Sequence, residues 1–371
     1  MEEVDLKALS TQVLWAVFGL SVLFGAIARR THFCTMGALA DIVTMGDWTR
    51  MRMWVLAMGV AMIGFNLMVG LGWLDASKSI YAGPRVLWLS ALVGGAMFGF
   101  GMVLASGCGA RTLVRIGGGN LKSLVVIIVL GIAAFATLKG ITAVARVAIL
   151  DAVAVRLESG QDLPSLLAAP AGMPKTVLAA VLGLGLGGSL IAWVLARAEG
   201  RSSNTVLAGG GLGAIVAAVW WVSGRLGHVA EDPSTLQEAF AATNSQRMES
   251  LSFVAPVAYV LDWLMFFSDK TKLLTSGIVS VFGMVAGSAA HAVLTRSFRW
   301  EGFRDAQDTG NHLGGALLMG VGGVTALGCT VGQGLSGLST LSLTSFVAFA
   351  AIVGGALAAL RWQAWRIERA G

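Results

Sequence analysis

The chain has 371 residues, of which 56% are hydrophobic and 12% are charged, and its mean hydropathy is +0.77. Soluble domains average about 25% charged residues, so this composition excludes a soluble globular domain and favours an integral membrane protein with a lipid bilayer around it. The formal charge is +6. No basic stripe alternates with aromatic residues, so we expect no nucleic-acid partner and ascribe the excess charge to cytoplasmic loops.

About nine apolar segments are long enough to cross a bilayer as helices. They are residues 13–28, 53–74, 86–105, 121–138, 177–196, 205–222, 276–294, 313–326 and 343–360. A further apolar segment, 251–267, is short and contains Pro256 and Asp262, which favours a re-entrant helix over a full span. The sequence therefore predicts an all-α integral membrane protein with about nine transmembrane helices and short re-entrant helices, forming one transport domain over residues 1–371.

Basic residues near the ends of these segments predict the orientation, because Lys and Arg concentrate in cytoplasmic loops. If the arginines of 29–52 are cytoplasmic, nine spans also place the basic 296–304 loop and the basic 361–369 tail in the cytoplasm. We therefore expect the N-terminus outside and the C-terminus inside. Counting 251–267 as a tenth full span would put both of the later basic regions outside.

The chain contains three cysteines, Cys34, Cys108 and Cys329, and each lies in a glycine-rich break between apolar segments. Lipid cannot satisfy the backbone of such a break, so each must lie inside the protein or beside a watery path. A neutral thiol donates a weak hydrogen bond and offers a soft sulfur, which suits transient contact with an anion. The alternative is that these cysteines are small buried apolar residues without a function. Their number and spacing indicate no disulfide framework or metal site, so we expect no cofactor.

Two of the breaks are similar in sequence. Residues 94–108 and 314–329 both begin Gly-Gly-Ala and end Gly-Cys. The predicted orientation turns the first hairpin near the cytoplasm and the second near the outside. This indicates an inverted internal repeat, with halves at about 13–138 and 205–360 and a binding site between them near the midplane.

Residues next to two of the cysteines are candidates for supporting anion binding, through positive charge, polar side chains or free backbone amides. They are Gly109, Arg111, Arg115, Lys122, Thr330, Gly332 and Gln333. The alternative is that the basic residues are ordinary cytoplasmic-side charges and the glycines ordinary turns. Asn120 is expected to be the N-cap of the helix that follows it.

Four stretches, 30–41, 107–123, 252–256 and 298–316, resemble motifs of the YeeE/YedE family of bacterial sulfur-transport membrane proteins. The resemblance implies uptake of thiosulfate across the inner membrane by a transporter that is not an enzyme. It also implies that the ion passes between thiols at Cys34, Cys108 and Cys329 through transient hydrogen bonds, and that a cytoplasmic TusA-like sulfurtransferase is a partner.

Three alternatives to this reading remain open at the level of the sequence. One keeps the fold and changes the cargo to a selenium species or another sulfur-containing anion. Another is a membrane sulfur relay that carries persulfide on the cysteines. The third is a membrane adaptor that recruits a sulfurtransferase without transporting anything.

Overall fold

The computed structural model describes residues 6–231, 236–303 and 305–370. Its α-helices are α1 (Leu6–Arg30), α2 (Thr35–Met45), α3 (Thr49–Gly70), α4 (Trp88–Leu104), α5 (Gly109–Gly117), α6 (Leu121–Lys139), α7 (Ile141–Ala145), α8 (Leu163–Ala171), α9 (Lys175–Leu195), α10 (Ser203–Val206), α11 (Leu212–Trp221), α12 (Ala255–Met265), α13 (Ser276–Leu294), α14 (Ala306–Thr325) and α15 (Leu343–Ala370). Short 3-10 and π segments are η1 (Ala76–Lys78), η2 (Arg146–Leu150), η3 (Ala198–Arg201), η4 (Leu207–Gly211), η5 (Val222–Leu226) and η6 (Gly332–Gly337). Two antiparallel pairs, β1 (Arg85–Val86) with β2 (Val155–Arg156) and β3 (His228–Val229) with β4 (Ala239–Phe240), complete the described part.

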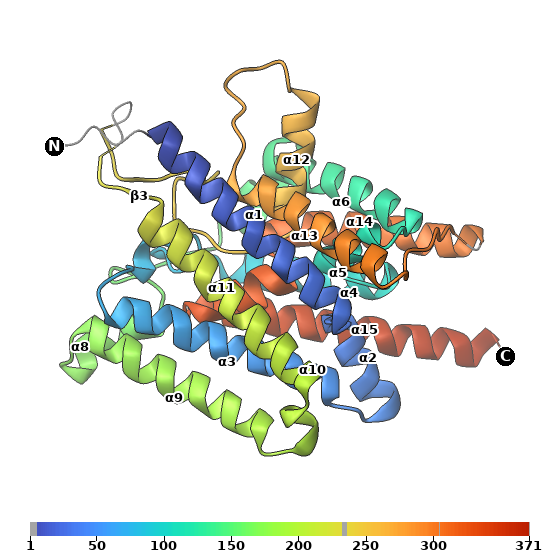
Figure 1. The fold of residues 1–371 in the computed structure, drawn as a ribbon, viewed down its shortest axis with the longest axis horizontal. Coiled ribbons are helices and arrows are strands. Elements are labelled where there is room, and N and C mark those ends of the chain that lie inside the picture. The colour runs from blue at the N-terminus through green and yellow to red at the C-terminus, as the bar shows by residue number, and fades with distance from the viewer. Residues whose placement is uncertain (1–5, 232–235, 304, 371) are drawn as a thin grey trace.

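The prediction of an all-α membrane fold is confirmed. Within the described residues, 8 helical stretches are long and apolar enough to cross a membrane, and they correspond to all the predicted spans except 313–326. That segment lies in α14, whose first turns carry Asp308 and His312 and so lower its mean hydropathy. The short apolar segment 251–267 contains the 11-residue helix α12, and its re-entrant path through the membrane stays a prediction. Most helices run along the long axis of the molecule, and the two chain ends lie at opposite ends of it (Figure 1).

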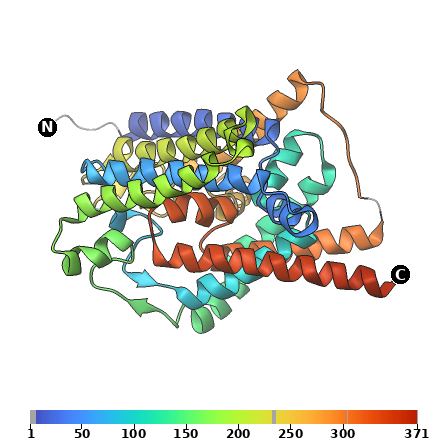
Figure 2. The ribbon, with the colours of Figure 1, turned by 90° about the horizontal axis from the view of Figure 1, so that it is seen from below.

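The pairs in which the helices pack are those expected if the chain consists of two repeated halves. Helix α4 packs against α14 and α15, and α14 packs in turn against α6. Likewise α1 packs against α13, and α3 packs against α11. If the second half repeats the first, α11, α13, α14 and α15 correspond to α1, α3, α4 and α6. Replacing each helix by its counterpart then gives the same set of packed pairs. Figure 2 shows α15 beside α4 over much of its length. The division into halves at 13–138 and 205–360 stays a prediction that this packing supports.

Helices α4 and α14 touch through their backbones at two glycine pairs. A Cβ at Gly94 would lie 2.7 Å from the Gly322 carbonyl oxygen, and one at Gly322 would lie 2.6 Å from the Gly94 oxygen. Gly101 and Gly315 are related in the same way, at 2.7 and 2.6 Å. Small residues at such crossings let membrane helices approach closely. The repeated glycines of the sequence thus bring together the two helices that end just before Cys108 and Cys329.

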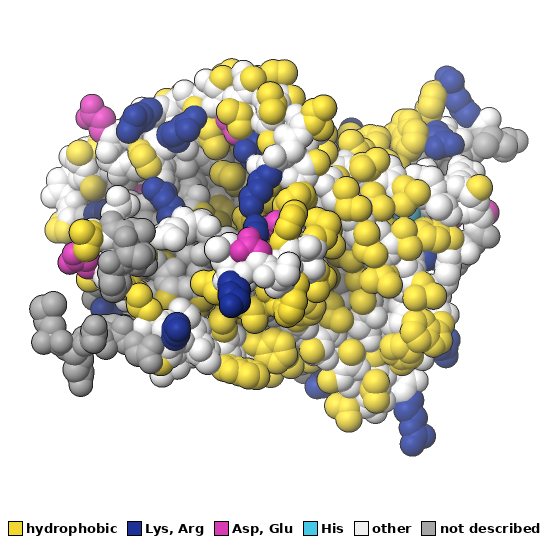
Figure 3. All heavy atoms as spheres, turned by 90° about the horizontal axis from the view of Figure 1, so that it is seen from above, with side chains coloured by type: hydrophobic (Ala, Val, Ile, Leu, Met, Phe, Trp, Pro, Cys, Tyr) yellow, Lys and Arg dark blue, Asp and Glu magenta, His cyan; other side chains and the backbone are white. Residues whose placement is uncertain are grey.

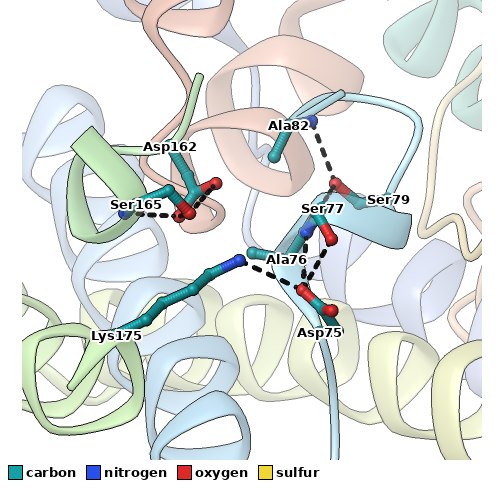
Figure 4. A network of polar contacts seen from close by, with 8 residues as sticks. All are labelled: Asp75, Ala76, Ser77, Ser79, Ala82, Asp162, Ser165 and Lys175. Carbon is teal, nitrogen blue, oxygen red and sulfur yellow. Dashed lines mark hydrogen bonds and ion pairs between the residues drawn. The ribbon is translucent and has the colours of Figure 1, made fainter. Parts of the chain in front are cut away.

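The described parts of the long connections 139–175 and 223–250 lie toward the end of the molecule where α1 begins (Figure 1). Asp75 caps η1 and forms an ion pair with Lys175 over 3.1 Å, while Asp162 caps α8 by accepting a hydrogen bond from Ser165 N at 3.0 Å (Figure 4). The start of α8 is joined to the segment after Cys329, because Leu163 N donates to Leu341 O over 3.1 Å. These connections therefore hold one end of the Cys329 segment in place.

The surface fits a protein surrounded by lipid. Large exposed apolar side chains lie on several of the long helices, among them Leu23, Ile132, Val181 and Phe282. Figure 3 shows a broad area of hydrophobic side chains on one half of the face it presents, with Lys and Arg mainly around its margins. Because lipid offers no hydrogen bonds, such a band is expected around membrane helices, with the polar groups turned inward or to the ends.

Candidate functional site: three thiols between two cavities

Each cysteine lies in a gap between two helices, and the three gaps share one backbone geometry. Two residues before each cysteine stands a non-glycine residue in the left-handed region. These residues are His32 (φ 53°), Ser106 (φ 55°) and Leu327 (φ 57°). Such a conformation is uncommon outside glycine and marks the end of a helix. The structure therefore contains one element, built three times, for presenting a cysteine.

Hydrogen bonds of the Schellman type close each of the three preceding helices. The amides of Phe33, Gly107 and Gly328 donate to carbonyls five residues earlier, at 3.1, 2.8 and 2.8 Å. These bonds satisfy carbonyls that the helix end would otherwise leave without partners. The chain is then free to leave the helix, place a cysteine, and start another helix immediately.

Each thiol stands at the beginning of the next helical stretch. Cys34 is the N-cap of α2 and Cys108 the N-cap of α5, while a short helical segment containing η6 follows Cys329. The Cys34 sulfur accepts a hydrogen bond from Gly37 N at 3.3 Å, and the Cys329 sulfur accepts one from Gly332 N at 3.4 Å. Because these amides use a lone pair of each sulfur, the S–H proton can still be donated elsewhere.

The fold brings the three cysteines into one buried group. Their exposed fractions are 6% for Cys34, 2% for Cys108 and 0% for Cys329. Cys108 is close enough to interact electrostatically with both of the other thiols. The hydroxyl of Thr330 lies beside the Cys108 thiol, and Thr330 Oγ1 is buried without a hydrogen-bond partner in the described structure. The thiols and this hydroxyl can therefore all donate to a guest placed among them.

A fourth segment, just before α12, completes the group. The hydroxyl of Ser252 lies beside the Cys329 thiol and the Tyr81 phenol. A Cβ at Gly332 would lie 2.6 Å from Ser252 Oγ, and one at Gly109 would lie 3.0 Å from the Phe253 carbonyl oxygen. Gly332 and Gly109 thus leave room for this segment. Residues 252–256 resemble a family motif, but Ser252 was not among the predicted site residues. The position of this motif just before a short helix that contains Pro256 was the available signal.

A cavity of about 300 Å³ is called the outer cavity here, after the predicted orientation of the chain. It reaches Ser252, which lies beside the Cys329 thiol, and Leu327, which stands two residues before Cys329. Its polar lining also includes Arg146, Arg247 and Glu249, and apolar side chains make up much of the rest.

A second cavity of about 300 Å³, called the inner cavity after the same predicted orientation, has a strongly basic lining. Arg29, Arg30, Arg111, Arg115, His32 and His291 line it, and no carboxylate among the described residues does so. Arg29 is fixed by donating from Nη2 to the Ser297 carbonyl and hydroxyl oxygens, at 3.2 and 3.1 Å. His32 belongs to the same break as Cys34. The lining of the inner cavity therefore comes within two residues of Cys34 along the chain.

The predicted supporting residues fall into different places. Arg111 and Arg115 line the inner cavity, as an anion path would require. Lys122 does not: its ammonium forms an ion pair with Asp308 at 2.7 Å in a separate cavity. Gln333 is fully buried, with Nε2 donating to Ala326 O and Oε1 without a partner in the described structure. Asn120 caps α6 by accepting a hydrogen bond from Ser123 N at 2.8 Å, which confirms that expectation.

Comparison with known proteins agrees with this architecture. A family profile for sulphur transport matches residues 30–358. The chain is 26% identical over 321 residues to the thiosulfate transporter TsuA of Escherichia coli (strain K12), covering 84% of each chain. It is 24% identical over 341 residues to the thiosulfate transporter TsuA of Spirochaeta thermophila, covering 88% of this chain and 91% of that one. A shorter match, 34% identical over 112 residues, covers 29% of this chain and 26% of the probable transporter YedE of Salmonella typhimurium. The chain belongs to the sulphur transport family, the YeeE/YedE family of multi-pass membrane proteins.

Proposed function

We propose that this protein carries thiosulfate into the cytoplasm, from the outer cavity past Cys329, Cys108 and Cys34 to the inner cavity. The observation that carries the proposal is the group of three thiols, each presented by the same broken-helix element, between two cavities. Two relatives that align along most of their length are thiosulfate transporters, which supports this choice of cargo.

The chemistry of the path suits a soft anion. The terminal sulfur of thiosulfate accepts weak hydrogen bonds from neutral thiols, and its oxygens accept bonds from hydroxyls such as those of Ser252 and Thr330. A conducting site must bind an ion firmly enough to admit it and loosely enough to release it. Weak donors in series meet that requirement better than one strong cationic site. No bond is made or broken in this scheme, so no catalytic step is part of the proposal.

The arrangement of charge supports inward movement. The arginines of the inner cavity attract an anion that has passed the thiols, since a basic concave surface focuses positive potential. Arg29 and Arg30 stand in the last turn of α1, and α1 runs toward the side of the molecule on which α15 ends with its basic last turn (Figure 1). By the distribution of basic residues we infer that this end faces the cytoplasm of a bacterial inner-membrane protein, with the N-terminus outside.

Thiosulfate uptake by cells that lack other importers tests the function. We expect wild-type protein to support uptake, and Cys108→Ala to reduce it by about 10-fold or more, the equivalent of one net hydrogen bond of about 1.4 kcal/mol. Cys108→Ser keeps a donor at the same place and is expected to retain part of the activity. Full uptake by Cys108→Ala, with equal amounts of protein in the membrane, contradicts the thiol path.

The rival cargoes and mechanisms give different results in the same cells. Competition by sulfate, sulfite and selenite shows whether a soft terminal sulfur is required or whether a selenium species or another sulfur-containing anion is preferred. A persulfide relay predicts a sulfur adduct on the cysteines, visible by mass spectrometry and removed by reductant. We further propose a TusA-like sulfurtransferase as the cytoplasmic partner; binding to it without any uptake would favour the adaptor alternative.

A further inference from the structure

A carboxylate lies in the wall of the outer cavity, where an anion path would be expected to exclude one. Glu249 lies between α11 and α12, half-buried in the wall of the cavity. Ser276 Oγ donates to its Oε1 over 2.8 Å, and Ser245 Oγ lies 3.4 Å from its Oε2. Ser252, which contacts the Cys329 thiol, lines the same cavity only three residues further along the chain.

The charged groups around Glu249 do not neutralise it. Arg146, in η2, also lines the cavity but forms an ion pair with Asp151 at 3.3 Å. Arg247, in the same segment as Glu249, directs Nη1 to the Ser79 carbonyl oxygen at 3.3 Å. Two titratable phenols, those of Tyr259 in α12 and Tyr81 before β1, interact electrostatically with the Glu249 carboxylate. The parts of the lining that come from α1, α6, α11 and α14 are apolar.

The contacts of the carboxylate itself are with neutral donors, namely Ser276, Ser245 and the backbone amide of Asn244. Burial outweighs these hydrogen bonds and raises the pKa of Glu249 to about 7. The physical cause is that a charge placed away from water loses solvation that the serines replace only in part. Near neutral pH, Glu249 therefore exists in both protonation states.

An anion in the outer cavity and a charge on Glu249 oppose each other. A divalent anion placed in this low-dielectric space makes ionisation of Glu249 less favourable, and by linkage protonation of Glu249 makes anion binding more favourable by the same factor. We propose that Glu249 is a proton-binding site of the outer cavity, and that the anion loads into this cavity only when Glu249 carries a proton. This inference rests on the proposed function, since it supposes that the cavity admits a sulfur-containing anion.

The pH dependence of thiosulfate uptake at low substrate concentration tests the proposal. Between external pH 6 and pH 8 the protonated fraction of a group that titrates near 7 falls about 10-fold, so we expect initial uptake to fall by about the same factor. Glu249→Gln, which stays neutral and can still accept the Ser276 hydrogen bond, is expected to change less than 2-fold over this range. Glu238→Gln alters an exposed carboxylate paired with Lys78 at the same end of the molecule, and is the matched control that keeps the wild-type pH profile.

Two further measurements keep the test decisive. Ser276→Ala removes a donor to the charged carboxylate, so the midpoint of the pH profile is expected to move upward while uptake at pH 6 is retained. Purified wild-type protein in weak buffer near pH 8 is expected to take up protons when thiosulfate is added, and Glu249→Gln is not. Wild-type uptake that does not vary with pH, or an unchanged profile in Glu249→Gln or Ser276→Ala, overturns the role of Glu249 and leaves the proposed function standing. Absence of thiosulfate uptake at every pH overturns the proposed function itself.

Discussion

Replacing Gly322 by alanine tests whether the glycine crossing of α4 and α14 sets the geometry of the thiol group. The added Cβ would lie 2.6 Å from the Gly94 carbonyl oxygen and 2.6 Å from Phe98 N. Both atoms belong to the backbone of α4, so no flexible side chain can move aside. The helices themselves must separate.

The size of the effect follows from these distances. Ordinary contact with a Cβ begins at 3.4 Å, so the required separation is 3.4 minus 2.6, about 0.8 Å. Overpacking of this kind typically costs about 1–3 kcal/mol of stability. The separation would also move the end of α14 relative to α4, and with it Cys329 relative to Cys108. We therefore expect both stability and thiosulfate uptake to fall.

Gly314→Ala is the matched control, because it lies in the same helix and a Cβ there has nothing within 4 Å. Thermal unfolding of the purified protein in detergent gives the stability, and uptake normalised to the amount of protein in the membrane gives the transport rate. Gly322→Ala should unfold at a lower temperature than Gly314→Ala and should transport more slowly. Equal stability and equal uptake for the two variants would refute the view that the α4–α14 contact positions the thiols.

The remaining predictions concern single side chains of the path. Arg111→Gln should lower uptake by about 10-fold, because it removes a cation from the inner cavity, whereas Lys122→Gln should leave uptake within about 2-fold, since Lys122 is paired with Asp308 in another cavity. Thr330→Val keeps the shape but removes the hydroxyl beside Cys108. It should slow uptake with little loss of stability, because among the described residues only the weakly hydrogen-bonding Cys108 thiol lies beside this hydroxyl. Ser252→Ala should raise the KM for thiosulfate, and an unchanged KM would argue against a role for this hydroxyl in admitting the ion.

The sequence determines the membrane helices almost by itself. A bilayer admits only segments that are apolar over about 20 residues, so hydropathy alone finds most of the spans. α14 shows the limit of this rule. Its apolar part was predicted from residue 313, but the helix begins at Ala306 because Asp305 caps it. A hydropathy profile therefore does not detect the polar turns with which a helix such as α14 begins.

The sequence also locates the breaks in the helices, since glycine and small polar residues stand out between apolar runs. It does not reveal that the three breaks have the same shape. His32, Ser106 and Leu327 have unrelated side chains, and their shared left-handed conformation follows from the hydrogen bonds that close each helix. Backbone geometry of this kind carries little signature in the side chains.

Only the tertiary structure decides which residues meet. Lys122 and Arg111 look equivalent in sequence, yet one is neutralised by Asp308, 186 residues away, while the other lines the inner cavity. Ser252 and Glu249 line the outer cavity from a segment that precedes α12, and no local pattern connects this segment to Cys329. Segments far apart in the chain are brought together by helix packing, and the glycine pairs between α4 and α14 set how close they come. The sequence thus determined the spans and the glycine-rich breaks that hold the cysteines, because both depend on local composition. The packing of distant helices decided that the three thiols lie in one buried group.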